Sequence, residues 1–246
     1  MYLAFLLPLV FALFALIKKK VTIPGIIAAY LMGVIITFIG GIYAFVALAG
    51  TFVLTILSDK LKKSKNDETR TLWQIICNVF VATLTLVFFR IYKNDGYLAL
   101  YYAVIASSLA DTLASSIGSL SKKKPINIKT FKRASTGESG AISLLGIGAS
   151  LVGGLFIGGV GFLYFKSFYI LLVIAFLGLF GSLVDSFLGA TIQGKFKCVV
   201  CKKNIEEKVH CGKSAKLIYG LSFVDNNIVN LLNNIFVFML GYIILI

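Results

Sequence analysis

The chain has 246 residues, of which 59% are apolar and only 14% are charged. A soluble domain carries about 25% charged residues, so this composition excludes a soluble globular protein and points to the lipid bilayer. The 24 basic residues exceed the 10 acidic ones and give a net charge of +14. In a membrane protein such an excess is typical of cytoplasmic loops, and we expect no nucleic-acid partner.

Long uncharged runs predict the membrane helices, because a helix that crosses about 30 Å of hydrocarbon needs roughly 20 apolar residues. Eight runs are present, and the first three are short for full spans, so one of them could be tilted or re-entrant. We therefore expect an all-α, polytopic membrane fold of seven to eight helices in a single domain over residues 1–246. In chain order the runs are Tyr2–Ile17, Pro24–Ile39, Ile42–Leu57, Leu72–Phe89, Tyr97–Ile117, Ala141–Phe165, Phe168–Ile192 and Leu221–Ile246.

The basic residues are distributed unevenly between the loops. If the amino terminus lies outside and all eight runs span, one side of the membrane receives 21 of the 24 basic residues, in loops 18–20, 60–70, 122–133 and 195–216. The other side receives only Arg90, Lys93 and Lys166. The positive-inside rule then places the four basic loops in the cytoplasm and both termini outside.

A short repeat marks the second half of the chain. Residues 108–112 read SLADT and residues 182–186 read SLVDS, and each copy lies about ten residues before a basic loop. Each loop is followed by a helix with a polar start, at residues 136–140 and 225–227. We interpret this pattern as a parallel duplication of helix hairpins, with chance similarity over five positions as the alternative.

The two repeats place Asp111 and Asp185 inside membrane spans, where ionisable groups are costly and often functional. Each aspartate belongs to a polar stripe with i, i+3, i+7 spacing, Ser108–Asp111–Ser115 in one span and Ser182–Asp185–Gly189 in the other. We expect both carboxylates to face one cavity with a cation between them. The alternative is two packing aspartates that are hydrogen-bonded to neighbouring hydroxyls.

Amide side chains form two further stripes. Asn226, Asn230 and Asn233 share one face of the last span, which Asp225 opens, and Gln74 and Asn78 follow Arg70 at i, i+4, i+8 spacing. Both stripes lie near the predicted cytoplasmic ends, which favours one polar site. Interhelical hydrogen bonding is the alternative role.

The segment 129–140, KTFKRASTGESG, combines three cations with two glycines just ahead of a predicted helix. Glycines let backbone N–H groups turn toward an anion, and a helix N-terminus adds partial positive charge, so phosphate binding is the expected use. The segment is not a Walker A motif. Positive-inside topology alone would also explain its cations.

The loop 195–216 contains Cys198-x2-Cys201 and the adjacent pair His210-Cys211. Soft ligands at this spacing suit a structural Zn²⁺ site, although adjacent ligands can reach one metal only through an unusual backbone turn. Free thiols are the alternative.

Four segments resemble a known family: ADTLASSIG from Ala110, STGESGAISLLG from Ser135, GSLVDSFLGA from Gly181 and HCG…DNNIVNLL from His210. In this order, over residues 60–246, they resemble the integral-membrane family that contains plant chloroplast phytyl-phosphate kinase and an animal transmembrane relative. The resemblance implies phosphoryl transfer from a nucleoside triphosphate, with CTP as a candidate donor, to a prenyl monophosphate. The product would be a prenyl diphosphate. Zinc is not implied by the resemblance.

Phosphoryl transfer asks a protein mainly to position phosphates and to neutralise their charge, usually through Mg²⁺ and Lys or Arg. Together with this resemblance, we assign Asp111, Asp185 and Asp225 as Mg²⁺ ligands, with Glu138 as a further catalytic candidate. The candidate residues for substrate and nucleotide binding are Lys129, Lys132, Arg133, Ser135, Gly137, Ser139, Gly140, Asn78, Gln74, Asn226 and Asn230. Two alternatives are a cytidylyltransferase that makes a CDP-lipid and a lipid or ion transporter.

Overall fold

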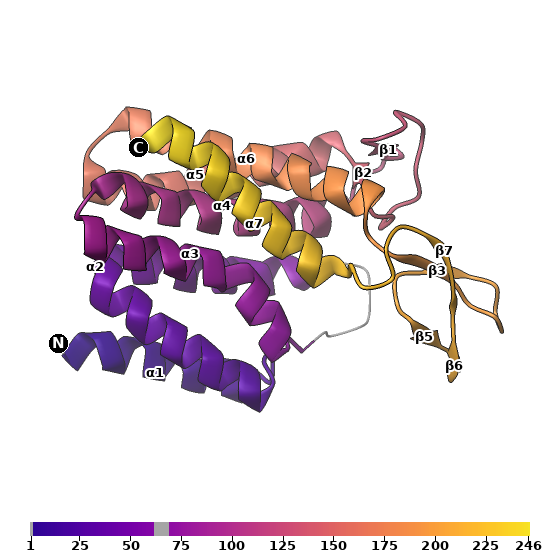
Figure 1. Ribbon diagram of the computed structural model, residues 1–246, viewed down its shortest axis with the longest axis horizontal. Coiled ribbons are helices and arrows are strands. Elements are labelled where there is room, and N and C mark those ends of the chain that lie inside the picture. Colours follow the sequence, from indigo (N-terminus) through magenta and orange to yellow (C-terminus); the bar gives the residue numbers. More distant parts are fainter. Residues whose placement is uncertain (1, 62–68) are drawn as a thin grey trace.

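The computed structural model describes residues 2–61 and 69–246. In this part of the chain, seven helices carry the fold, and six of them are long and apolar enough to cross a membrane (Figure 1). The all-helical membrane fold predicted from the sequence is confirmed. The helices are α1 (Tyr2–Ile17), α2 (Ile23–Asp59), α3 (Leu72–Tyr92), α4 (Asp95–Gly118), α5 (Leu144–Phe165), α6 (Phe168–Thr191) and α7 (Asn226–Leu245).

The second and third apolar runs form one interrupted helix, α2. Gly41 breaks it with φ 74° and ψ −170°, a conformation that glycine adopts without steric cost. Both ends of α2 lie at the same end of the molecule, because Val21 bridges Arg70, whose Nη2 lies 3.2 Å from Asp59 Oδ2. A straight helix of 37 residues would separate its ends by about 55 Å. The chain therefore reverses direction at Gly41, which reconciles eight apolar runs with seven helices.

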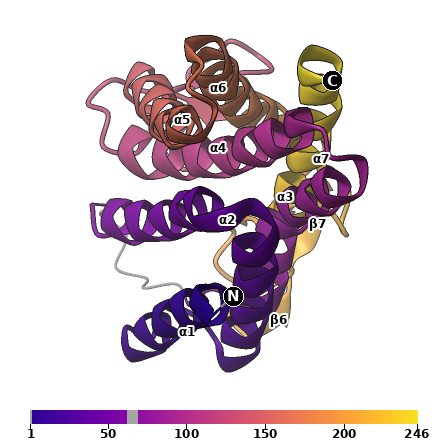
Figure 2. The same ribbon diagram turned by 90° about the vertical axis from the view of Figure 1, so that its left-hand side faces the viewer.

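Helix α4 occupies the centre of the bundle. It packs against α2, α3, α5, α6 and α7, and every residue from Leu98 to Ala106 is at most 1% exposed. Figure 2 shows α5 and α6 on one side of α4, with α1 and α2 on the other. Close packing with α5 depends on small residues, since a Cβ added to Gly153 would lie 3.2 Å from Ala110 Cα. The centre of the membrane bundle is thus fixed by α4.

The basic loops lie at one end of the bundle, and both termini lie at the other (Figure 1). Asp59 Oδ1 accepts a hydrogen bond from Ser116 Oγ near the end of α4 (3.3 Å), and Lys195 Nζ donates to the carbonyl of Ser139 (3.4 Å). The first contact joins the end of α2 to the end of α4, and the second joins the loop after α6 to the loop after α4. Part of the predicted basic loop 60–70, residues 62–68, lies outside the described residues.

Two apolar runs begin before their helices do. Ala141–Ile142 forms strand β2, paired with β1 (Ile126–Asn127), and α5 starts only after Ser143, whose side chain accepts a hydrogen bond from Gly146 N. The last apolar run begins at Leu221, but α7 starts after Asp225, the residue predicted to open this helix. Hydropathy alone therefore placed both starts too early.

The loop after α6 contains five short strands that were not predicted from the sequence. Strands β4, β3 and β7 form a three-stranded antiparallel sheet, and β5 pairs with β6 in a hairpin. Their bounds are β3 (Lys195–Lys197), β4 (Asn204–Ile205), β5 (Val209–His210), β6 (Lys213–Ser214) and β7 (Lys216–Tyr219). We call residues 195–219 the Cys/His loop. Both hairpins, α4 to α5 and α6 to α7, run to the basic end and back (Figure 1), while their common origin by duplication stays a prediction.

Candidate functional site

A cavity of about 220 Å³ opens at the basic end of the bundle, between α4, α5, α6 and the loop that precedes α5. Four carboxylates line it: Asp111 from α4, Asp185 from α6, Glu138 from the loop before α5, and Glu206 from the Cys/His loop. Within the described residues, no Lys or Arg side chain lines this cavity. Hydroxyl groups complete the wall, from Ser115, Ser119, Thr136, Ser139, Ser143, Ser150, Ser182 and Ser186. The cavity is therefore rich in oxygen donors and strongly acidic.

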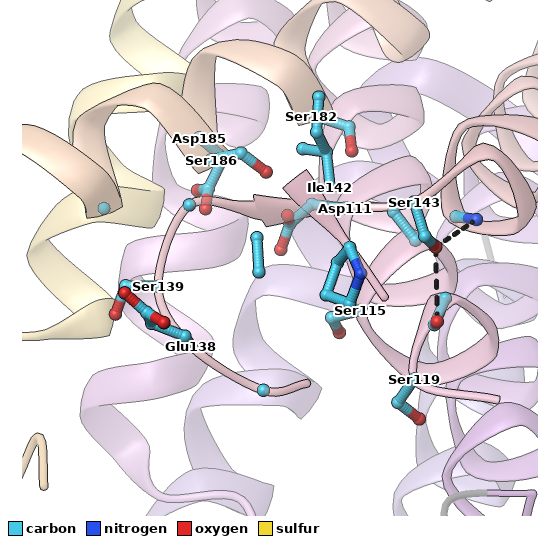
Figure 3. A pocket seen from close by; sticks show the side chains of 18 of the residues that line it. Asp111, Ser115, Ser119, Glu138, Ser139, Ile142, Ser143, Ser182, Asp185 and Ser186 are labelled. Carbon is cyan, nitrogen blue, oxygen red and sulfur yellow. Dashed lines mark hydrogen bonds between the residues drawn. The ribbon is translucent and has the colours of Figure 1, made fainter. Parts of the chain in front are cut away.

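Helical periodicity brings the two membrane aspartates to this cavity. Figure 3 shows the side chains of Asp111 and Asp185 directed into the same space from two different helices. Asp185 is only 7% exposed, and its Oδ2 is buried with no hydrogen-bond partner among the described residues. A buried carboxylate oxygen without a donor is costly unless a proton or a cation reaches it. The site thus has the charge and the unsatisfied acceptor that a metal ion would use.

The residues of the polar stripe on α4 have two different roles. Ser115 lines the cavity beside Asp111, whereas Ser108 Oγ lies 3.2 Å from Asn234 Oδ1 on α7. On α6 the whole predicted stripe, including Ser182 and Gly189, lines the cavity. The matched spacing therefore places both aspartates in one site but leaves Ser108 in helix packing.

The glycine-containing loop 136–140 forms the outer wall of the cavity. Gly137 and Gly140 both have φ of 83°, and a Cβ added to Gly140 would lie 3.1 Å from the carbonyl oxygen of Ser186. The turn is closed by the carboxylate of Glu138, which accepts a hydrogen bond from the N–H of Ser135 (3.2 Å). Gly140 thus permits both the left-handed backbone and the close approach to α6.

Three predicted phosphate-binding cations, Lys129, Lys132 and Arg133, do not line the cavity. All three are exposed on the loop at the basic end, and Lys129 Nζ lies 2.5 Å from Tyr219 Oη. Ser135 is exposed as well and does not line the cavity. The structure places these groups outside the acidic cavity, where they face solvent.

The predicted amides of α3 are used within their own helix. Gln74 forms a reciprocal capping box with Thr71, and Asn78 Nδ2 donates to the carbonyl of Gln74 (2.8 Å). Neither amide lines the cavity.

On α7, Asn226 lines the cavity and Asn230 does not. Asp225 caps the helix: its Oδ1 accepts from Ile228 N (2.9 Å) and its Oδ2 from Asn227 Nδ2 (3.2 Å). With both oxygens used by its own helix terminus, Asp225 does not join Asp111 and Asp185.

Two other asparagines of α7 hold helices together. Asn233 Nδ2 donates to Ser107 Oγ (3.0 Å), and Asn234 Nδ2 donates to the carbonyl of Cys77 (3.1 Å). Both asparagines are buried, so this part of the stripe serves as interhelical hydrogen bonding.

Two residues of the site, Gln193 and Glu206, were not predicted from the sequence. Gln193 is 2% exposed just beyond α6, and its Nε2 donates to Glu206 Oε2 (2.8 Å). A polar residue directly after an apolar run was the available signal for Gln193. Glu206 had none, because its place depends on how the Cys/His loop folds back over the membrane bundle.

The four predicted zinc ligands, Cys198, Cys201, His210 and Cys211, lie together, with their ligand atoms all within 4.8 Å of one another. The turn needed by adjacent ligands is present: Cys211 and Gly212 link β5 to β6 with φ of 53° and 72°. Such a two-residue turn with positive φ at both positions is the common type I′ hairpin connection.

Electrostatics also favour a thiolate in this cluster. The backbone N–H of Cys201 donates to Cys198 Sγ (3.4 Å), and this hydrogen bond is the main cause that lowers the pKa of Cys198 to about 6. A thiolate is the form that binds metals. The cluster could therefore hold a metal ion such as Zn²⁺.

Comparisons with known proteins agree with a membrane protein. A family model described as "Integral membrane protein DUF92" matches residues 6–238. An uncharacterized membrane protein of Methanocaldococcus jannaschii is 31% identical over 203 residues, which cover 80% of this chain and 82% of that one. Protein PGR of Arabidopsis thaliana is 31% identical over 252 residues, with 87% and 85% covered. No solved structure matches.

Proposed function

The chain belongs to the DUF92 family of integral multi-pass membrane proteins, and we propose that it is a phosphotransferase of the bilayer. The reaction would move the terminal phosphoryl group of a nucleoside triphosphate, with CTP as a candidate donor, to a prenyl monophosphate. The observation that carries the proposal is the acidic, hydroxyl-lined cavity at the end of the bundle where the basic loops gather. Such a cavity suits phosphoryl transfer, because carboxylates can hold the Mg²⁺ that in turn binds the phosphates.

The residues of the cavity fit Mg²⁺. This ion prefers oxygen ligands and is usually bound by one or two carboxylates together with phosphate oxygens and water. Asp111 and Asp185 would hold it, since they enter the cavity from two helices and Asp185 Oδ2 lacks a partner among the described residues. Glu138 would contribute from the loop side. When bound, Mg²⁺ supplies positive charge that neutralises the phosphate oxygens during transfer.

The protein's own groups would bind and orient the phosphates. The N-terminal ends of α5 and α7 reach the cavity through Ser143 and Asn226, so partial positive charge from both helices faces bound phosphates. Lys129, Lys132 and Arg133 are exposed at the same end, where they would attract the anionic nucleotide before it enters. The reaction itself requires an oxygen of the lipid phosphate to approach the terminal phosphorus in line with the leaving nucleoside diphosphate.

The two substrates come from different phases. We place the basic end in the cytoplasm because it carries most of the lysines and arginines. A nucleotide then arrives from the cytosol, while the prenyl tail stays in the bilayer and presents its phosphate at the interface. A cavity at one end of the bundle suits this meeting of a soluble and a lipid substrate.

We also propose that Cys198, Cys201, His210 and Cys211 bind a structural Zn²⁺. Three thiolates and one imidazole fill a tetrahedral shell and leave no open position for a substrate. The converging ligand atoms and the β5–β6 turn support this assignment.

The proposal is tested with purified protein in nanodiscs, Mg²⁺, nucleoside triphosphates labelled at the terminal phosphate, and a panel of prenyl alcohols and monophosphates. We expect label in a prenyl diphosphate when a monophosphate is offered, and its loss in Asp111→Asn. Label in no lipid across the whole panel would show the proposal to be wrong.

A further inference from the structure

The Cys/His loop reaches back over the membrane bundle and contacts the wall of the cavity. Glu206 uses both carboxylate oxygens: Oε1 accepts from Ser139 Oγ, and Oε2 accepts from Gln193 Nε2 (2.8 Å). From the same loop, Lys195 Nζ donates to the carbonyl of Ser139 (3.4 Å) and lies 3.8 Å from Glu138 Oε1. The loop therefore holds the segment 138–139 at both its backbone and its side chains.

Glu206 lies between the two pairs of metal-ligand residues. It follows Cys201 by five residues and precedes His210 by four. On one side, strand β4 pairs Ile205 with Phe196 of β3, and on the other, strand β5 begins three residues after Glu206 and contains His210. Both flanks of Glu206 are consequently tied to the Cys/His cluster.

The loop has little else to hold its shape. Its strands are two to four residues long, and Phe196 and Cys198 are its buried hydrophobic residues within the described chain. Short strands without a hydrophobic face are marginal in water, and small modules usually need disulfides or a metal. The fold of the loop, and with it the place of Glu206, should depend on metal binding.

We propose that Zn²⁺ bound by the Cys/His cluster sets the position of Glu206, and that Glu206 in turn fixes Ser139 and Glu138 in the cavity wall. Glu206 is then a positioning residue for the acidic cavity, and the metal cluster supports the cavity from a distance. This inference rests on the proposed zinc site but not on the identity of the reaction.

Hydrogen–deuterium exchange of residues 134–142, read against zinc content, tests this coupling. Within this segment the N–H groups of Ala134, Glu138 and Ala141 are hydrogen-bonded to backbone carbonyls, so their exchange reports local opening. The decisive variant is Glu206→Gln, which keeps size but removes charge. The matched control is Glu207→Gln, because Glu207 is the next residue along the chain and makes no hydrogen bond or ion pair within the described residues.

We expect the wild-type protein to contain one zinc per chain. Glu206→Gln should keep that zinc and the exchange pattern of residues 195–219, while residues 134–142 exchange about fivefold faster or more. Chelation of the zinc, or Cys201→Ser, should speed exchange in both segments. Glu207→Gln should change neither.

Two results would overturn the inference separately. Purified protein without zinc removes the metal site and the coupling with it. Zinc present, but unchanged exchange at residues 134–142 in Glu206→Gln, removes the positioning role alone. Neither result bears on the kinase proposal, which is decided by the labelled product.

Discussion

Replacing Asp185 by asparagine tests whether Asp185 is a metal ligand or only a packing residue. The side chain is 7% exposed, and its Oδ2 has no partner within the described chain. Asparagine keeps the shape and removes the charge. Losing one group that stabilises transferring charge costs about 10²–10³ in turnover in other enzymes, and we expect a loss of this size here. The apo protein should be as stable as the wild type or more stable, because a charge with few donors no longer has to be buried.

The Mg²⁺-dependent shift in melting temperature tests the same role of Asp185 without an activity assay. A ligand at one hundred times its Kd stabilises the folded state by about 2.7 kcal/mol. For a chain of this size that corresponds to roughly 5–10 °C in Tm. We expect this shift in the wild type and its loss in Asp185→Asn. Asp95→Asn is the matched control, since Asp95 is exposed in the first turn of α4 at the opposite end.

The assay is thermal unfolding in detergent with and without Mg²⁺, run beside turnover on the same preparations. A Mg²⁺-dependent shift that persists in Asp185→Asn, together with turnover near the wild-type value, would show that Asp185 is not a Mg²⁺ ligand. Loss of stability in both conditions would instead identify Asp185 as a packing residue.

Two further predictions concern the path of the chain. Gly41→Ala should lower the free energy of unfolding by about 1–3 kcal/mol, because φ 74° and ψ −170° are strained for any side chain. The control Gly159→Ala, where an added Cβ meets nothing within 4 Å, should cost little. Equal melting points of the two variants would contradict the break in α2. Single cysteines at Lys123 and Lys208 should react with a membrane-impermeant maleimide from the same side of a sealed vesicle, and a single cysteine at Lys166 should react from the opposite side. Labelling of the Lys123 and Lys208 positions from opposite sides would overturn the topology.

The helices were predictable because hydrocarbon thickness imposes a length and a composition on every span. The reversal at Gly41 agrees with the two separate apolar runs, Pro24–Ile39 and Ile42–Leu57, although hydropathy alone does not show that a single glycine makes the turn. The late start of α5 escaped prediction, because Ser143 is a cap inside apolar sequence and only its backbone geometry reveals it. The start of α7 was predicted from its polar residues, and Asp225 is indeed its cap.

The centre of the candidate site followed from helical periodicity. Asp111 and Asp185 hold the same place in two short similar segments, and each belongs to a polar stripe of i, i+3, i+7 spacing, from which a shared cavity was predicted. The amide stripe of α7 was ambiguous, because Asn226 lines the cavity while Asn233 bonds to Ser107 in the helix interface. Periodicity gives the face of a helix but not which neighbour that face meets.

The outer wall of the site depends on long-range folding of loops. Glu206 reaches Ser139 across 67 positions of sequence through a chain of short strands and a candidate metal cluster. No local pattern encodes such a contact. The cations of residues 129–133 are the opposite case. Their local pattern predicted phosphate binding, but the structure places them outside the cavity.

CTP with distinguishable labels at its α and terminal phosphates decides whether this protein transfers the terminal phosphoryl group of a nucleotide to a lipid phosphate. The labelled CTP is incubated with Mg²⁺, the protein and a prenyl monophosphate, and the lipids are then extracted. We expect only the terminal label to enter the lipid and CDP to remain in water. The α label in the lipid, with release of pyrophosphate, would instead identify a cytidylyltransferase.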